Sequence, residues 1–127
     1  MSELSVVGQS VPRVDGLEKV TGAAQYVDDM DFGPGLLYAC IVESPLAHAR
    51  IKAIDTRAAA AVPGVVKVVT GADFPYKFGL YMKDRYMFAH DRVRFVGEQV
   101  AAVIAWDAKT AARAAALVQV EYEELPA

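Results

Sequence analysis

The pattern of hydrophobic and polar positions predicts strands separated by short helices. A near-continuous apolar run covers residues 36–42, follows a Gly-Pro-Gly turn at 33–35 and stops at the Ser-Pro pair 44–45. An apolar run of this length predicts a strand. Residues 49–54 instead alternate between apolar and polar side chains, which predicts a strand with one wetter face.

A compact strand–helix–strand unit follows. Asp55 or Thr56 is placed to cap an alanine-rich helix over residues 57–62, and the Pro-Gly pair 63–64 ends it. The β-branched run 65–70 then predicts a strand.

The last third of the chain repeats these signals. Polarity alternates over residues 92–96, a turn is expected at Gly97, and residues 100–106 form an apolar run, which predicts a hairpin or a bulged strand. Asp107 is expected to cap a helix that runs to about residue 117.

This last helix has small residues that allow close approach to a sheet. They are Ala111, Ala112, Ala115 and Ala116. A final strand is expected over residues 118–123. Strands grouped around two main helices, without regular β-α alternation, predict an α+β fold with a mixed sheet.

Two segments lack a single period. Residues 7–30 predict irregular chain with one helical turn that begins at Asp15. Residues 71–90 predict a long loop that is unusually rich in aromatic rings. These rings belong to Phe74, Tyr76, Phe78, Tyr81, Tyr86 and Phe88. Either they pack on the chain's own sheet, or the segment 74–88 is mobile or covered by a neighbouring domain or subunit.

Composition favours one globular domain over residues 1–127, with 54% hydrophobic and 23% charged residues. The formal charge of -3 and the scattered Lys and Arg exclude a basic nucleic-acid interface. No segment approaches a membrane span, and the first residues lack the basic region and apolar stretch of a targeting signal, so we expect a soluble, untargeted chain. The single cysteine, Cys40, excludes an internal disulfide and predicts a buried thiol and a cytoplasmic location.

Few residues are candidates for catalysis or metal binding. His48 and His90 are candidate bases or metal ligands, but neither has a Cys or His at a ligand spacing, so we expect structural hydrogen bonds. Ser44 with His48 as base is a candidate hydrolytic pair without the glycines of a nucleophile elbow. Lys83 lies beside Met82, but the second methionine of a biotin site is absent.

Charged candidates are equally isolated. Asp28, Asp29 and Asp31 lack the spacing of a calcium loop, which predicts turn or helix-end roles. Glu98 is expected in a solvated turn. Arg92 and Arg94 could grip an anion from one strand face, although a solvated or interface face is the simpler interpretation.

Several strings occur in order and cover the chain except for its aromatic segment. They are Arg13-Val14-Asp15, Lys19-Val20-Thr21-Gly22 with Tyr26 and Asp29, Ser44-Pro45-Leu46-Ala47-His48-Ala49-Arg50-Ile51, Pro63-Gly64-Val65, Asp91-Arg92-Val93-Arg94-Phe95-Val96-Gly97-Glu98-Gln99-Val100-Ala101, and Glu121-Tyr122-Glu123-Glu124-Leu125-Pro126. In this order they resemble the molybdenum hydroxylases, the family of xanthine dehydrogenase and aldehyde oxidase. Glu43 and Gln99 depart from the pattern, which often has Arg and Pro there.

The resemblance implies an α/β hammerhead domain at the N-terminus of a larger molybdenum-binding subunit. In that family, pterin-bound molybdenum and the catalytic glutamate lie further along the subunit, and iron–sulfur clusters and FAD lie on other domains or subunits. A chain with one cysteine cannot supply the ligands of an iron–sulfur cluster. We therefore expect no catalytic, cofactor-binding or metal-binding residue in 1–127, and a non-catalytic scaffold role within an oxidoreductase.

Two other functions remain open. The first is a self-standing interaction module that docks through its aromatic loop. The second is a small hydrolase that uses Ser44 and His48.

Overall fold

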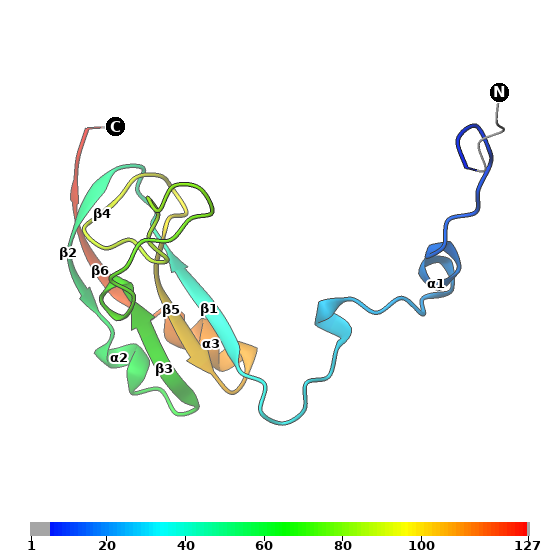
Figure 1. The fold of residues 1–127 in the computed structure, drawn as a ribbon. Coiled ribbons are helices and arrows are strands. Elements are labelled where there is room, and N and C mark those ends of the chain that lie inside the picture. The colour runs from blue at the N-terminus through cyan, green and yellow to red at the C-terminus, as the bar shows by residue number, and fades with distance from the viewer. Residues whose placement is uncertain (1–5, 127) are drawn as a thin grey trace. The chain divides into compact units, whose positions relative to one another are not determined.

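A computed structural model describes residues 6–126 of the chain (Figure 1). The chain divides into two compact units, residues 1–34 and residues 35–127, which are described separately. We call residues 6–34 the N-terminal arm. It contains the helix α1, Gly16–Thr21, and a 3-10 turn, Val27–Asp29. A single domain over the whole chain stays a prediction.

The second unit contains six strands in two three-stranded sheets (Figure 1). The first sheet has the order β1-β5-β3, with β1 at Tyr38–Glu43, β5 at Gln99–Ala105 and β3 at Val65–Thr70. The second has the order β4-β2-β6, with β4 at Arg92–Val93, β2 at Ala49–Asp55 and β6 at Gln119–Glu124. Two helices complete the unit, α2 at Arg57–Ala60 and α3 at Ala108–Ala115.

The predicted α+β class is confirmed, but the single mixed sheet is wrong. Every neighbouring strand pair is antiparallel. Residues 44–48 and 94–98 carry the chain from one sheet to the other, so β1 and β2 lie in different sheets, as do β4 and β5. The predicted hairpin is therefore also wrong, because β4 pairs with β2 and β5 pairs with β1 and β3.

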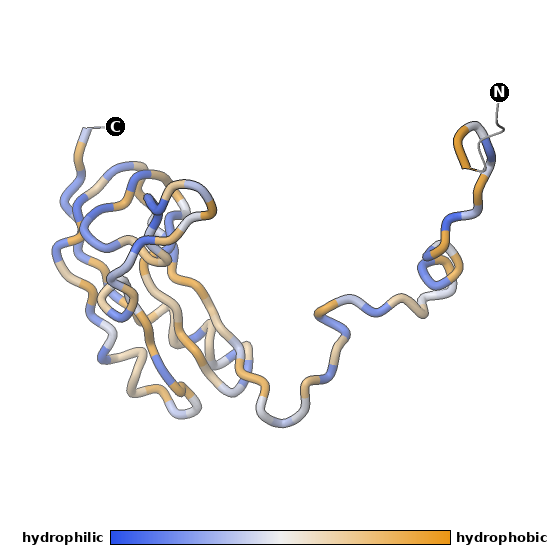
Figure 2. The backbone as a smooth tube through the Cα atoms, in the orientation of Figure 1, coloured by the Kyte–Doolittle hydropathy of each residue, from blue (hydrophilic) through white to orange (hydrophobic). Residues whose placement is uncertain are grey.

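The strand β5 lies at the centre of the first sheet and is buried on both faces. Val103 contacts a cluster with Ala59 of α2 and Ala114 of α3 on one face. Ala102 packs with Val69 and Phe88 on the other. Figure 2 shows how hydrophobic residues concentrate along these strands. A third cluster, which includes Val93 and Val100, joins the second sheet to the start of β5.

The strand β1 is less buried than its apolar sequence predicts. It forms an edge of its sheet and packs against α3, and Tyr38 and Ile41 keep 44% and 39% of their surface exposed. An apolar run in an edge strand has only one covered face. Cys40 is accordingly half-buried rather than fully buried.

Both predicted main helices are present, and the structure shows which residue caps each of them. Asp107 Oδ1 accepts a hydrogen bond from Thr110 N at 2.8 Å, as expected of the cap of α3. At α2 the capping acceptor is Asp55, whose Oδ1 accepts from Arg57 N at 3.0 Å.

The buried face of α3 differs from the predicted one. Ala111 and Ala114 are buried, whereas Ala112 and Ala116 are exposed. The contact follows the i, i+3, i+4 spacing from Ala111 rather than the two adjacent pairs.

Residues 71–90, which we call the finger, form both core and surface. Phe88 is 5% exposed, and Phe74 lies 5.9 Å from it between ring centroids. An antiparallel bridge joins Phe78 to Arg85 further out. Beyond this bridge Leu80 and Tyr81 are about as exposed as free side chains, at 90% and 94%. The base therefore covers the sheet, while the tip exposes apolar side chains.

Candidate functional site

The connections between the sheets meet at one place, which we call the sheet crossing and define as residues 43–46 and 94–99. Ser44 N donates to Glu98 O at 2.9 Å, and Gly97 N donates to Ser44 O at 2.8 Å. Two of the strings singled out in the sequence thus bind each other through their backbones. Gly97 has φ +87°, a left-handed conformation that glycine adopts without strain.

Ser44 is used inside the crossing. Its side chain is buried at 3% exposure, and its Oγ both donates to Leu46 O and accepts from Leu46 N at 3.1 Å. Burial raises the pKa of nearby Tyr122, although a hydrogen bond with Ser44 opposes this. A serine in such a turn is a structural element.

His48 has a different partner. Its Nδ1 lies 2.6 Å from Pro126 O, and its own carbonyl accepts from Leu125 N at 2.9 Å. The expected structural hydrogen bond is confirmed for His48. Among the hydrogen bonds of residues 6–126, none joins Ser44 to His48, and the residues of the predicted hydrolytic pair serve separate contacts.

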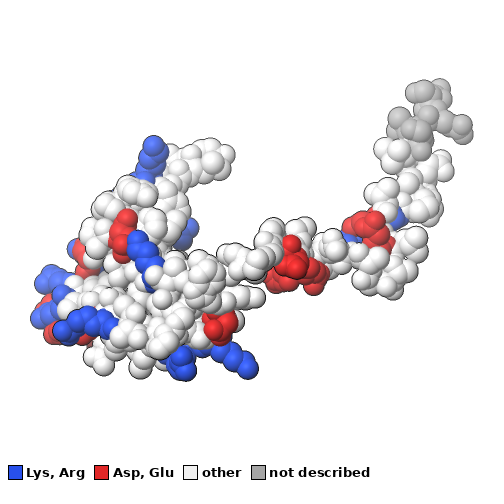
Figure 3. Space-filling model, turned by 90° about the horizontal axis from the view of Figure 1, so that it is seen from below, with Lys and Arg blue, Asp and Glu red and all other residues white. Residues whose placement is uncertain are grey.

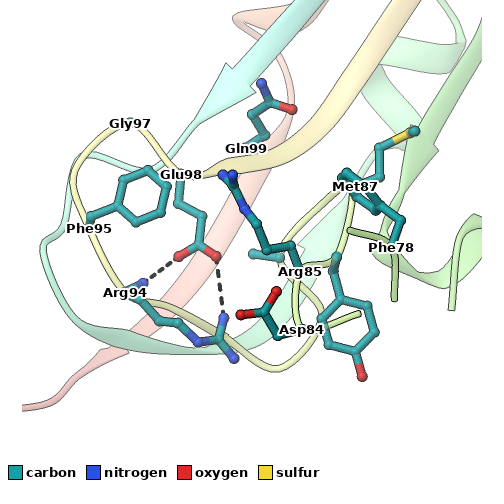
Figure 4. A pocket seen from close by; sticks show the side chains of 11 residues that line it. Phe78, Asp84, Arg85, Met87, Arg94, Phe95, Gly97, Glu98 and Gln99 are labelled. Atoms are coloured by element: carbon teal, nitrogen blue, oxygen red, sulfur yellow. Dashed lines mark hydrogen bonds and ion pairs between the residues drawn. The ribbon is translucent and has the colours of Figure 1, made fainter. Parts of the chain in front are cut away.

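Glu98 corrects the prediction of a solvated turn. Its side chain is only 16% exposed, and its Oε1 lies 3.2 Å from an Arg94 guanidinium nitrogen. The Arg94 backbone N–H also donates to the Glu98 carboxylate (Figure 4). One carboxylate thus holds both ends of the turn that links β4 to β5.

Arg92 and Arg94 already have an internal anion. Asp91 accepts from Arg92 Nε and from Arg94, each at 3.2 Å. Burial raises the pKa of Asp91, but the Arg92 hydrogen bond and the charges of both arginines outweigh it and lower this pKa. The proposed anion grip is occupied by the protein's own carboxylate.

The remaining candidates also serve local structure. Asp29 Oδ2 accepts from Tyr26 N at 3.0 Å, and Asp31 Oδ1 accepts from Gly33 N at 2.8 Å, which confirms turn roles for both. His90 does not confirm its predicted hydrogen bond: its ring packs edge-on against Tyr86 at 5.4 Å between centroids.

A cavity of about 540 Å³ lies between the finger and the sheet crossing (Figure 4). Arg85 from the finger and Gln99 from the start of β5 line it, Phe78, Met87 and Phe95 supply apolar walls, and Asp84 and Glu98 add carboxylates. Arg85 forms no ion pair among residues 6–126. Composition and periodicity gave no signal for this cavity, because its walls come from the irregular segment 78–89 and the turn 94–99, which follow no single period.

The donor groups of the described residues do not form a metal or cofactor site. No group of three or more His, Cys, Asp or Glu side chains in residues 6–126 is placed to hold a metal ion. One cysteine does not fit an iron–sulfur cluster, which takes several thiolate or imidazole ligands. The cavity wall carries the carboxylates of Asp84 and Glu98 beside the guanidinium groups of Arg85 and Arg94, so it has no excess of positive charge for a phosphorylated pterin.

Residues 21–126 match the sequence pattern of a family described as aldehyde oxidase and xanthine dehydrogenase, a/b hammerhead domain. The chain belongs to this family. The predicted resemblance and the predicted hammerhead architecture are therefore confirmed. The two antiparallel sheets described above therefore belong to a hammerhead domain of the molybdenum hydroxylases.

Curated relatives share most of this hammerhead chain. A xanthine dehydrogenase of Emericella nidulans is 38% identical over 95% of this chain, which spans 9% of that relative. The carbon monoxide dehydrogenase large chain of Afipia carboxidovorans is 40% identical over 98% of this chain, which spans 16% of it. The chain therefore corresponds to a small part of these proteins.

Solved structures agree in fold. A Cu,Mo-dependent CO dehydrogenase matches with a TM-score of 0.86 and 40% identity, over 94% of this chain and 16% of that one. An aldehyde oxidoreductase from Desulfovibrio desulfuricans matches with a TM-score of 0.82 and 30% identity, over 94% of this chain and 15% of that one.

The helices within residues 6–126 are all too short or too polar to span a membrane.

The structure also relates the two residues that depart from the family pattern. Glu43 and Gln99 are direct partners in the register of β1 and β5, at a bulge beside Gly97. In the sequence these two positions are far apart. Only strand pairing shows that they form one local change at the sheet crossing.

Proposed function

We propose that this hammerhead chain is a non-catalytic scaffold domain in the molybdenum-binding subunit of a molybdenum hydroxylase. One observation carries the proposal: the polar side chains that could do chemistry are used to build the fold. Ser44 closes its own turn, Glu98 binds Arg94, and His48 Nδ1 donates to Pro126 O. Groups held by such contacts give rigidity rather than reactivity.

The parent protein in this proposal is an oxidoreductase. Its substrate is a heterocycle, an aldehyde or an aromatic thioester, and its molybdenum is held by a pterin outside this chain. Iron–sulfur clusters and a flavin would belong to other domains or subunits, and the assembly would be cytoplasmic. Relatives named as a CO dehydrogenase large chain and a large molybdopterin subunit support this reading.

In this proposal the domain contributes a fixed arrangement of surfaces rather than a reactive group. The crossing fixes the angle between the two sheets, and the finger base is held on the first sheet by Phe74 and Phe88. The exposed tip is thereby presented on a firm support. A scaffold needs such a preorganised surface so that docking costs little ordering entropy.

Metal content tests the proposal. The continuous reading frame that contains this chain and the 127-residue chain alone would be purified from the same host, and molybdenum and pterin would be quantified in both. We expect about one molybdenum per long polypeptide and none in the 127-residue chain. A long protein without molybdenum, or stoichiometric metal in the short chain, would contradict the proposal.

A second function is favoured by one observation. Leu80, Tyr81 and Met82 are 90%, 94% and 70% exposed at the finger tip, as in a self-standing interaction module. A native stop codon after residue 127 would favour the module. A frame that continues into glycine-rich cofactor loops would favour the enzyme.

A further inference from the structure

The chain stays beside β2 for a short distance after β6 ends. The ladder between the two strands closes with Glu124 opposite Ala49. Leu125 N then donates to His48 O at 2.9 Å, which extends the pairing by one residue. The next residue, Pro126, has no backbone N–H and cannot donate to the ladder. Any further contact at this end of the strand must use the Pro126 carbonyl.

The imidazole of His48 makes that contact. Its Nδ1 lies 2.6 Å from Pro126 O, although the two residues are 78 positions apart in the sequence. A carbonyl oxygen only accepts, so the proton is on Nδ1, and in the neutral ring Nε2 carries the lone pair. We call this hydrogen bond and the one from Leu125 N to His48 O the exit contacts. Together they hold the chain where it leaves β6.

His48 is fixed by the residues on both sides of it. Before it, the Ser44 side chain closes its turn through two hydrogen bonds with Leu46. After it, Ala49 is buried in the core cluster against which Leu46 packs. His48 itself is half-buried. Because the backbone that carries the imidazole is already ordered, binding Pro126 costs little additional entropy.

The same connections hold the base of the finger. The turn 94–99 binds the backbone of Ser44 at the sheet crossing. Where β5 begins, Gln99 O accepts a hydrogen bond from Ala89 N of the finger at 2.7 Å. The finger base and the exit contacts are thus attached to the two connections that meet at the crossing. The direction of the chain at Pro126 is consequently set relative to the finger.

We infer that His48 is a positioning residue, whose Nδ1–H holds Pro126 O and sets the direction in which the chain leaves the hammerhead fold. This role deepens the proposed function and rests on it, since a scaffold domain needs a fixed exit only where the chain continues into the rest of the subunit. His48 does no chemistry in this role. It gives the scaffold two fixed ends, the finger base and the exit from β6.

Two substitutions of His48 separate the donor atom from the rest of the ring. In His48→Asn the side-chain amide nitrogen is as many bonds from the backbone as Nδ1, whereas in His48→Gln it takes the position of Nε2. The exit contacts should therefore survive in His48→Asn and be lost in His48→Gln.

Amide hydrogen exchange measured by NMR in the 127-residue chain tests this difference. The reporter is the Leu125 amide, because it frays together with Pro126, which has no amide proton. We expect exchange about tenfold faster in His48→Gln, the effect of losing one hydrogen bond, and little change in His48→Asn. The Gly97 amide, which donates to Ser44 O at the crossing, is the internal control and should be unchanged in both variants.

NMR of the imidazole nitrogens gives an independent signature. In the wild-type chain the neutral His48 ring should carry its proton on Nδ1, and a proton on Nε2 would overturn the inference. Three exchange results would also overturn it. These are an unchanged Leu125 amide in His48→Gln, equally fast exchange in the two variants, and an equal acceleration at Gly97, which would make His48 a support of the whole fold.

The full-length subunit tests the role in the longer chain. Exchange over residues 119–127, followed by mass spectrometry, should be faster in His48→Gln than in the wild type and in His48→Asn. No difference there would contradict the inference even if the short chain responded. Molybdenum content of the wild-type sample separates the two proposals, because a metal-free subunit that shows this difference would contradict only the proposed function.

Discussion

At the scale of single residues, a few polar contacts define the sheet crossing. Glu98 reaches back to both the backbone and the guanidinium of Arg94, and Ser44 satisfies its own turn. Buried polar groups with partners stabilise one conformation, whereas the same groups without partners are costly. The route of the chain between the sheets therefore depends on a few side chains.

The Glu98→Gln variant tests this dependence. Loss of the negative charge weakens both contacts with Arg94, so the free energy of unfolding should fall by about 1–2 kcal/mol. The measurement is urea unfolding followed by circular dichroism. Glu124→Gln, at an exposed position of β6, is the matched control and should change stability by less than about 0.5 kcal/mol. Equal effects of the two variants would contradict the role of Glu98.

Gly71→Ala tests the attachment of the finger base. A Cβ at Gly71 would lie 2.8 Å from Ala89 O, which is backbone and cannot move aside alone. We expect a loss of about 1–3 kcal/mol from overpacking. Gly35→Ala is the control, since a Cβ there meets nothing within 4 Å. The two urea midpoints should differ clearly, and a neutral Gly71→Ala would show that the two finger ends are not held together.

At the scale of elements, α3 is positioned by one narrow stripe of alanines. Ala114 is fully buried against Val103, while Ala112 of the same helix is exposed. Small side chains allow the helix to approach β1 and β5 closely. A larger residue on the stripe must displace the helix.

Paired valine substitutions measure that approach. Ala114→Val should lower the free energy of unfolding by about 1–3 kcal/mol because it overpacks the helix–sheet contact. Ala112→Val should cost less than about 1 kcal/mol, because only helix propensity changes. Thermal unfolding midpoints of the two variants measure this difference. If Ala112→Val were the more harmful change, the observed helix face would be wrong.

The start of α2 provides a pH prediction. The Arg57 guanidinium and its backbone N–H hold the pKa of Asp55 at about 2. A lowered pKa in the folded state stabilises the protein above the unfolded value near 3.8, and this stabilisation disappears as the pH falls through about 2. In Arg57→Gln the pKa of Asp55 should rise toward 3.8 in an NMR titration.

The same pair predicts how stability depends on pH. The advantage of the wild type over Arg57→Gln should be largest above about pH 4 and vanish near pH 2. Arg50→Gln is the control, because Arg50 pairs with Glu123 and not with Asp55. An unchanged Asp55 titration in Arg57→Gln would contradict the assignment.

At the scale of the whole molecule, the most exposed large apolar side chains of residues 35–126 lie at the finger tip. Figure 3 shows acidic and basic side chains interspersed over one face of the molecule, without a single basic field. The tip instead presents Leu80, Tyr81 and Met82. Surfaces of this kind are covered in functional assemblies.

Chymotrypsin tests the tip. In a dilute solution of the 127-residue chain, cleavage should occur after Tyr81 and not after buried Phe88, and assembly into the full-length subunit should suppress it at least tenfold. Mass spectrometry of the fragments identifies the site. Resistance of Tyr81 in the dilute chain would show that the finger is folded against its own domain and would remove the reason for a covering partner.

Much of this protein follows from its sequence alone. The strand 65–70, the position of α3 and its Asp107 cap are local, since periodicity and capping act within a few residues. The family resemblance also follows from ordered strings.

Tertiary structure decided the rest. Strand pairing set the two antiparallel sheets in place of one and the opposition of Glu43 to Gln99. These depend on residues that are distant in sequence, where hydrophobic period has no information about partners. Whether the aromatic rings are core or surface was decided in the same way: Phe88 faces β5, whereas Tyr81 lies beyond the bridge.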